Sequence, residues 1–110
     1  LIYHKTTRRE IYSQARKSCP ELDDVLLWNE KGELTESTIA NLIVELDGQL
    51  ITPPVSSGLL PGICRANLLE NKIVSTRIIR LEDLSRCTRV FLANAVRGTW
   101  EVEVRLPSKS

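Results

Sequence analysis

The alternation of apolar and polar positions along the 110 residues predicts short strands that are joined by turns. A continuous apolar run at residues 25–28 has strand length and is typical of a strand covered on both faces. A longer strand-like run extends through residues 34–46. Asp47-Gly48 then predicts a tight hairpin turn of the primed type, after which residues 49–52 return as the partner strand.

Two segments carry helical patterns. Residues 8–18 place Ile11 and Ala15 on one face, and Pro20 enforces the end of that helix. Residues 59–65 are typical of a loop that feeds a second helix, with Pro61 suited to the first helical position, and this helix ends at residues 71–72. The remaining pattern predicts strands at residues 1–3, 73–79, 90–93 and 100–106, loops at 55–58 and 94–98, and one helical turn at 81–84. The sum is one mixed α/β (α+β) domain with about seven strands and two main helices.

Composition and charge exclude several classes of protein. Apolar residues make up 42% of the chain, and fifteen basic side chains nearly balance fourteen acidic ones, so no overall field attracts nucleic acid or an anionic membrane. No apolar run reaches the length that spans a bilayer. Three cysteines without a C-x-x-C motif and a single histidine predict reduced thiols and no metal site. We therefore expect a cytoplasmic protein with no nucleic-acid partner.

The chain begins with Leu1 and contains no methionine. This predicts that the sequence is a piece of a longer polypeptide.

Lys5 lies between two predicted elements. The apolar residues 1–3 predict a short strand, and Thr7-Arg8-Arg9-Glu10 has the spacing of a capping box at a helix start. Lys5 is therefore expected on the connection where the strand becomes a helix. Taken alone, a lysine in this place is an ordinary solvated charge, so its interpretation depends on three later segments.

Those segments, together with His4-Lys5-Thr6-Thr7, carry a resemblance to a known family. They are Gly32-Glu33-Leu34-Thr35-Glu36 followed by Asn41, Thr52-Pro53-Pro54 with the loop from Gly58 to Arg65, and Asn94-Ala95-Val96-Arg97-Gly98. In this order and at these intervals they resemble the C-terminal domain of the class IV aminotransferases, the fold-type IV enzymes that use pyridoxal 5'-phosphate. Within the family the sequence motifs are most similar to those of aminodeoxychorismate lyase, as in fusions with para-aminobenzoate synthase.

The resemblance implies a role for particular residues. Lys5 occupies the position of the lysine that holds pyridoxal phosphate covalently and later moves a proton. Glu36 matches the glutamate that pairs with the pyridine nitrogen and keeps the ring protonated. Gly62, with the backbone amides of Ile63 and Cys64 at a helix start, matches the loop that holds the phosphate.

Ala95 belongs to the second loop that faces the phosphate and the substrate. Many relatives carry a hydroxyl where Ala95 stands, so the resemblance predicts one lost hydrogen bond to the phosphate, worth about 1.5–3 kcal/mol. Cys64 stands where a threonine is common, but its backbone amide is unaffected. Arg65 is expected to be solvated or to pair structurally rather than to bind the cofactor.

The implied activity is release of pyruvate and 4-aminobenzoate from 4-amino-4-deoxychorismate, a step of folate biosynthesis. The alternatives are a branched-chain or D-amino-acid aminotransferase and a non-catalytic fragment that mediates association. The resemblance also implies a homodimer, and a smaller N-terminal domain or a synthase component that completes the site. We expect the isolated chain to fold, but to hold pyridoxal phosphate weakly and to show no lyase activity.

Overall fold

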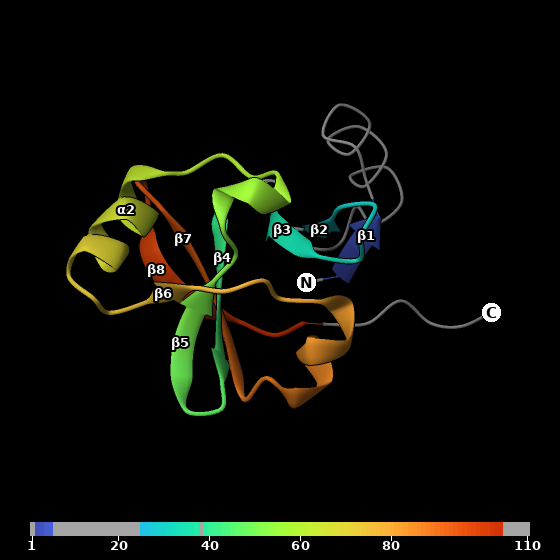
Figure 1. Ribbon diagram of the computed structural model, residues 1–110. Helices are drawn as coiled ribbons and strands as arrows, with labels where there is room; N and C mark the ends of the chain where they lie inside the picture. The colour runs from blue at the N-terminus through green and yellow to red at the C-terminus, as the bar shows by residue number, and fades with distance from the viewer. Residues whose placement is uncertain (1, 6–24, 38, 105–110) are drawn as a thin grey trace.

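The structure is a computed structural model that describes residues 2–5, 25–37 and 39–104 (Figure 1). Within these residues the chain forms one eight-stranded sheet together with short helices. The strands are β1 (Ile2–Lys5), β2 (Val25–Trp28), β3 (Leu34–Ser37), β4 (Asn41–Leu46), β5 (Gln49–Thr52), β6 (Ser75–Thr76), β7 (Arg89–Asn94) and β8 (Gly98–Val102). The helices are the 3-10 helices η1 (Val55–Ser57) and η2 (Leu81–Arg86) and the α-helix α2 (Ile63–Glu70).

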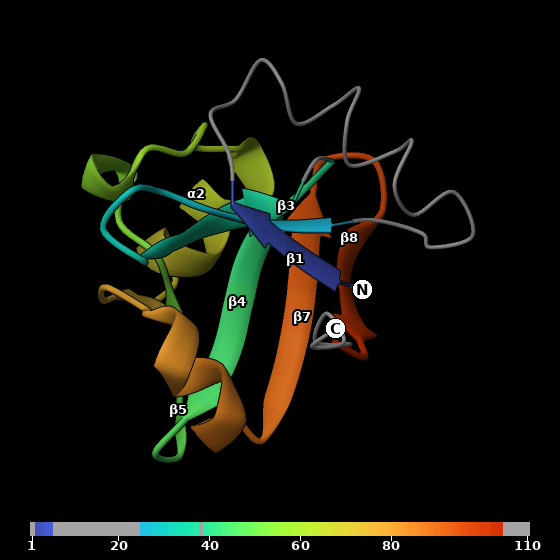
Figure 2. The same ribbon diagram turned by 90° about the vertical axis from the view of Figure 1, so that its right-hand side faces the viewer.

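Strand β4 is the centre of the sheet. It pairs antiparallel with β3, β5 and β7, and β7 pairs antiparallel with β8. Figure 2 shows β4 and β7 side by side as the longest part of the sheet. Strands β1 and β2 pair in parallel, and β5 and β6 form the other parallel pair. The mixed sheet with helices agrees with the predicted fold class.

The core lies on both faces of β4. Leu42, Val44 and Leu46 face one cluster, while Ile43 faces a second cluster that lies under α2. Because successive side chains of a strand point to opposite faces, a strand buried on both sides reads as a continuous apolar run. The same explanation holds for Leu26 and Leu27 in β2, which are both buried, as the apolar run predicted.

The Asp47-Gly48 hairpin forms as predicted. Asp47 and Gly48 have φ values of 53° and 77°, the left-handed pair that a primed turn requires. The register Leu46↔Gln49 places β5 directly opposite β4. This turn is therefore specified by its own two residues.

The predicted run 34–46 is wrong as a single strand, because it folds into β3 and β4. The Ser37 amide donates to the Ala40 carbonyl at 2.9 Å, and the Ala40 amide donates to the Ser37 hydroxyl at 2.9 Å. These bonds reverse the chain, after which Glu36 and Asn41 lie opposite one another. The apolar pattern continues through the reversal, so periodicity alone could not locate it.

Several predicted boundaries differ from the structure. Pro61 precedes α2 instead of beginning it, since Gly62 is the N-cap, in an extended conformation. The predicted strand 73–79 pairs only at Ser75–Thr76, because β5 runs into Pro53, which has no amide to extend the ladder. The segment 55–58 contains the 3-10 helix η1, η2 continues to Arg86, and β8 begins at Gly98 and ends at Val102. The predicted helix 8–18 lies outside the described residues.

Candidate active site

A cavity of about 390 Å³ opens where three connections meet at one end of β4. Its walls are residues 36, 37 and 39–41 around the β3–β4 reversal, residues 60–63 before and at the start of α2, and residues 93–95 at the end of β7. Four of the residues predicted to bind a cofactor line this cavity: Glu36, Gly62, Ile63 and Ala95. These residues are separated by up to 59 positions in the sequence, so the sheet topology brings them together.

Glu36 supplies the charge of the cavity wall. Its side chain is only 7% exposed, and the Leu60 amide donates to Glu36 Oε1 at 3.3 Å. Among the described residues that line the cavity, Glu36 is the only charged one. A buried carboxylate at this place suits a cationic N–H group of a bound molecule.

The N-terminus of α2 forms a second polar element of the cavity. Gly62 is its N-cap and makes no side-chain capping bond, while the Ala66 amide donates to the Gly62 carbonyl at 3.0 Å to begin the helical ladder. The first amides of a helix, here those of Ile63 and Cys64, have no acceptor within the helix. Together with the positive end of the helix dipole they suit an anionic group such as a phosphate.

The Cys64 side chain lies outside the cavity wall. Its Sγ is 3.8 Å from Thr99 Oγ1, and it packs against the cluster under α2. The position therefore contributes a backbone amide at the helix start, as the sequence predicted, while its side chain contacts β8.

Asn41 ties the loop before α2 to the sheet. Its Nδ2 donates to the Leu60 carbonyl at 2.8 Å, and the Gly62 amide donates to its Oδ1 at 3.0 Å. A larger residue in place of Gly62 would displace the Asn41 side chain, because a Cβ atom would lie 2.7 Å from Asn41 Oδ1. Asn41 follows Glu36 in the motifs that carry the family resemblance, but no local signal shows which distant loop its side chain binds.

Asn94 likewise holds the β7–β8 turn in place through side-chain hydrogen bonds. Its Oδ1 accepts hydrogen bonds from the amides of Val96 and Arg97, at 3.1 and 2.7 Å, and its Nδ2 donates to the Ile39 carbonyl at 3.2 Å. The result holds Ala95 at the cavity wall with a methyl group and no hydroxyl. Asparagine at the start of a turn that ends in glycine is the sequence signal for the local part of this arrangement.

Lys5 is the last residue of β1 rather than part of the following connection, which corrects its predicted place. It pairs with Trp28 of β2, and Trp28 pairs with Leu34 of β3. Two strand spacings, about 10 Å, therefore separate the Lys5 backbone from the strand that carries Glu36. The Lys5 side chain lies outside the described part of the structure.

Arg65 is buried and faces away from the cavity wall. Its exposed fraction is 5%, and its guanidinium donates to the Pro53 carbonyl at 3.1 Å. Burial lowers the pKa of this guanidinium. The contact ties α2 to the end of β5, which agrees with the predicted structural role.

Another carboxylate, Glu33, is held on the turn between β2 and β3. Asn29 Nδ2 donates to its Oε1 at 2.9 Å, and the Ser57 hydroxyl lies 3.3 Å from the same oxygen. The bond from Asn29 is the largest cause that lowers the pKa of Glu33, and burial opposes it. Glu33 does not line the cavity that contains Glu36.

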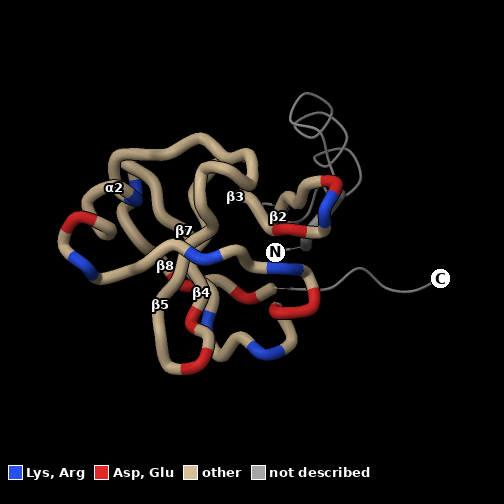
Figure 3. Tube along the Cα trace, in the orientation of Figure 1, with Lys and Arg blue, Asp and Glu red and all other residues tan. Residues whose placement is uncertain are grey.

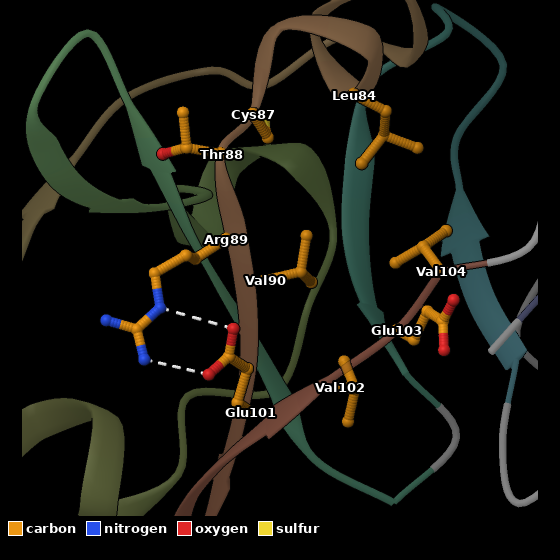
Figure 4. Close-up of a pocket in the computed structure, with 9 residues that line it drawn as sticks. All are labelled: Leu84, Cys87, Thr88, Arg89, Val90, Glu101, Val102, Glu103 and Val104. Atoms are coloured by element: carbon orange, nitrogen blue, oxygen red, sulfur yellow. Dashed lines mark hydrogen bonds and ion pairs between the residues drawn. The ribbon is translucent and has the colours of Figure 1, made fainter.

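A larger cavity, of about 600 Å³, lies along β7 and β8 (Figure 4). Its charged residues include Arg89 and Glu101, which bind one another across the two strands at 2.8 and 3.2 Å. The remaining lining includes Val90, Val102 and Val104, and none of the residues predicted to form the site belongs to it. Chemistry, not volume, therefore favours the smaller cavity.

The described residues give no sign of a metal site or a membrane span. No group of three or more potential metal ligands occurs in residues 2–5, 25–37 and 39–104. Within the same residues, none of the helices has both the length and the apolarity needed to cross a bilayer. Figure 3 shows acidic and basic residues spread around the described trace.

The sequence matches the profile of the amino-transferase class IV family over residues 1–104, and the chain belongs to this family. A Schizosaccharomyces pombe protein assigned as an aminodeoxychorismate lyase is 37% identical over 101 residues, which cover 86% of this chain and 44% of that protein.

Solved structures agree with this assignment and show the fold-type IV architecture. A Mesorhizobium loti protein assigned as an amino-acid aminotransferase is 33% identical with a TM-score of 0.79, and the match covers 96% of this chain and 59% of that one. A Legionella pneumophila protein assigned as a 4-amino-4-deoxychorismate lyase is 32% identical with a TM-score of 0.76, over 92% and 40% of the two chains. The chain thus spans about two fifths to three fifths of these relatives.

Members of the family use pyridoxal phosphate, and the cavity fits that molecule. The uncapped N-terminus of α2 suits its phosphate, and the buried Glu36 carboxylate suits its ring nitrogen. Both features line the same cavity. Glu36, Gly62 and Ile63, which the sequence predicted for the two ends of the cofactor, therefore share one cavity, and their roles stay predictions.

Proposed function

We propose that this chain is the large, cofactor-binding domain of an aminodeoxychorismate lyase, which releases pyruvate and 4-aminobenzoate from 4-amino-4-deoxychorismate. The observation that carries the cofactor part of the proposal is the shared cavity of Glu36 and the α2 N-terminus. The lyase part is supported by the 37% identity with the S. pombe relative and the 32% identity with the L. pneumophila structure.

Each residue has a proposed task. The amides of Ile63 and Cys64 bind the phosphate, and Glu36 accepts the proton of the ring nitrogen in a hydrogen bond. When bound, pyridoxal phosphate supplies an electron-withdrawing ring that stabilises negative charge on a substrate carbon. The Lys5 amine removes the proton from the substrate carbon that bears the amino group. Cleavage of the ether bond between the ring carbon and oxygen then releases enolpyruvate, which takes up a proton to become pyruvate, and the ring becomes aromatic.

The chain by itself is proposed to bind the cofactor weakly. A phosphate monoester carries about two negative charges at neutral pH, whereas the described cavity wall contributes neutral amides and the Glu36 carboxylate. One charge-assisted hydrogen bond is worth about 1.5–3 kcal/mol, so a missing cation weakens binding by roughly ten- to a hundredfold. We propose that a further domain, a synthase component or a second copy of the chain supplies the missing contacts.

An aminotransferase is the second candidate function. The M. loti relative, which is assigned as an amino-acid aminotransferase, is as similar in sequence as the L. pneumophila lyase and supports this alternative. Both reactions need the lysine, the glutamate and the phosphate loop. The site described above therefore supports the cofactor more strongly than it distinguishes the two reactions.

The test of cofactor use is covalent trapping. Excess pyridoxal phosphate and borohydride should label Lys5 in the wild-type chain, and Lys5→Ala should lose the label while keeping the circular dichroism spectrum. Lys72→Ala, a change on an exposed residue after α2, is the control that should keep it. A label on Lys31 or Lys72 in place of Lys5 would contradict the assignment.

The test of the reaction uses the longest natural polypeptide that contains residues 1–110. Release of pyruvate from 4-amino-4-deoxychorismate supports the lyase, and amino transfer to a branched-chain keto acid supports the aminotransferase. Lys5 labelling with neither activity would support the non-catalytic alternative.

A further inference from the structure

We propose that Asn41 is the positioning residue that sets the phosphate-binding end of the site relative to Glu36. The inference rests on the proposed function, and it concerns a residue that does not itself touch the cofactor. Asn41 is the first residue of β4 and is only 5% exposed. Its backbone pairs with Glu36 on one side and with Ala93 on the other, so it sits where the three walls of the cavity meet.

The Asn41 side chain acts as a substitute peptide group for the neighbouring loop. Its Nδ2 donates to the Leu60 carbonyl at 2.8 Å and its Oδ1 accepts from the Gly62 amide at 3.0 Å. One donor and one acceptor thus bind residues two positions apart, which is the spacing that a partner strand would use. Gly62, the last residue of this loop, is held in an extended conformation by these bonds.

This pair of bonds determines where α2 begins. Gly62 is the N-cap, with φ −84° and ψ 165°. Asn41 Oδ1 occupies the space that a Cβ atom on Gly62 would need. Holding the Gly62 amide fixes the peptide plane between Pro61 and Gly62, and with it the position of the N-cap residue from which Ile63 continues. The direction of the first free amides of α2, which suit a phosphate, therefore depends on Asn41.

The same loop residue connects Asn41 to Glu36. Leu60 receives a hydrogen bond at its carbonyl from Asn41 and donates its amide to Glu36 Oε1 at 3.3 Å. Because Glu36 and Asn41 are also opposite one another in the sheet, the loop is bound at two points of one rigid frame. The distance between the carboxylate and the helix start is thereby fixed before any ligand arrives.

The experiment compares two asparagines that serve opposite ends of α2. Asn41→Ala removes both bonds to the loop, whereas the control Asn71→Ala removes the bond from Asn71 Nδ2 to the Asn67 carbonyl at the exposed helix end. We expect Asn41→Ala to weaken pyridoxal phosphate binding by roughly ten- to a hundredfold, the equivalent of two lost hydrogen bonds. Binding of pyridoxal, which lacks the phosphate, should change less than threefold, and Asn71→Ala should affect neither.

Amide hydrogen exchange of the cofactor-free protein gives a second readout. The Leu60 and Gly62 amides should exchange faster in Asn41→Ala, while those of β4 and β7 keep their protection. Asn41→Asp should be intermediate in phosphate affinity, because it keeps the acceptor for Gly62 and loses the donor for Leu60. Equal losses for pyridoxal phosphate and pyridoxal, or unchanged exchange at Gly62, would overturn the inference.

The outcomes separate this inference from the proposed function. A wild-type protein that forms no lysine adduct, yet binds inorganic phosphate in a manner that depends on Asn41, would contradict the function and support the positioning role. A lysine adduct in both proteins with unchanged phosphate affinity in Asn41→Ala would contradict the positioning role alone.

Discussion

The Asp47-Gly48 turn and the loop of residues 60–62 lie at opposite ends of β4 and are held in different ways (Figure 1). The turn depends on two residues with positive φ, and its partner strands are adjacent in sequence. The loop is held by Glu36 and Asn41, which lie 19 to 24 positions away. One connection is therefore encoded locally, and the other exists only once the sheet has formed.

The difference determines what each connection can do. A turn that specifies itself adds stability and register but presents no preorganised polar groups to a ligand. A loop bound by buried side chains has its amides fixed in advance, at a defined distance from a carboxylate. Preorganised dipoles of this kind are what ligand binding and catalysis require.

The largest expected effect concerns chemistry and leaves the loop in place. Glu36→Gln keeps an oxygen that can accept the Leu60 amide, but an amide cannot hold the ring nitrogen of the cofactor protonated. In the longest natural polypeptide that contains residues 1–110, we expect turnover to fall by orders of magnitude in a pyruvate-release assay, with lysine labelling retained. Glu70→Gln, an exposed change at the end of α2, is the control. A near-normal rate for Glu36→Gln would remove Glu36 from the mechanism.

The next change breaks the loop itself. Gly62→Ala would place a Cβ atom 2.7 Å from Asn41 Oδ1, so the Asn41 side chain has to move and its hydrogen bonds to Leu60 and Gly62 are weakened. We expect a cost of about 1–3 kcal/mol in the free energy of unfolding, as for other overpacked sites, and at least a tenfold loss of pyridoxal phosphate affinity. Denaturant titration and cofactor titration measure the two effects. Tight cofactor binding by Gly62→Ala would show that the loop binds the cofactor without the Asn41 hydrogen bonds.

Gly48→Ala is the matched change in the locally encoded turn. Its φ of 77° is unfavourable for alanine, although the space around it is open. We expect a loss of about 1 kcal/mol, which lowers Tm by roughly 4–8 °C, and no change in cofactor affinity. An affinity change as large as that of Gly62→Ala would abolish the distinction between the two ends of β4.

The same distinction explains what the sequence could predict. The β2 strand, the Asp47-Gly48 turn and the buried part of β7 follow from apolar runs and turn residues, and all three are present. The break between β3 and β4 was missed, because Ser37 and Ala40 close it with hydrogen bonds inside a continuous strand-like pattern.

The sequence predicted residues that line the candidate site but not the hydrogen bonds that hold its loops in place. Residue types at matching intervals indicated Glu36, Gly62, Ile63 and Ala95, and these residues share a cavity. The long-range hydrogen bonds of Asn41 and Asn94 could not be read from the sequence, since each binds a loop that only the sheet topology brings near. The roles of Lys5 and of the cofactor remain predictions for the labelling experiment.

The smallest expected effect tests a third connection, which combines both principles. The turn between β2 and β3 has a locally favoured residue, Gly32, at a φ of 75°. It is also held by a side-chain hydrogen bond, which Asn29 donates to Glu33. Since the pKa of Glu33 is lowered in the folded protein, chiefly by the Asn29 hydrogen bond, its stabilisation is complete above the ordinary glutamate pKa, about 4.3. This stabilisation is lost as the pH falls below the ordinary pKa and through the lowered pKa of Glu33 in the folded protein.

Glu33→Gln removes the titration and keeps an acceptor for Asn29. We expect the wild type to be more stable than Glu33→Gln at pH 7 by a few tenths to about 1 kcal/mol, the size of one partly solvated hydrogen bond. The difference should shrink below about pH 4.3 as the wild-type carboxylate gains its proton. Urea titrations at pH 7, 5 and 3 measure it, with Glu30→Gln on the exposed part of the same turn as the control. A difference that is constant with pH would mean that Glu33 contributes through its shape alone, and that this turn, like Asp47-Gly48, is held by its backbone.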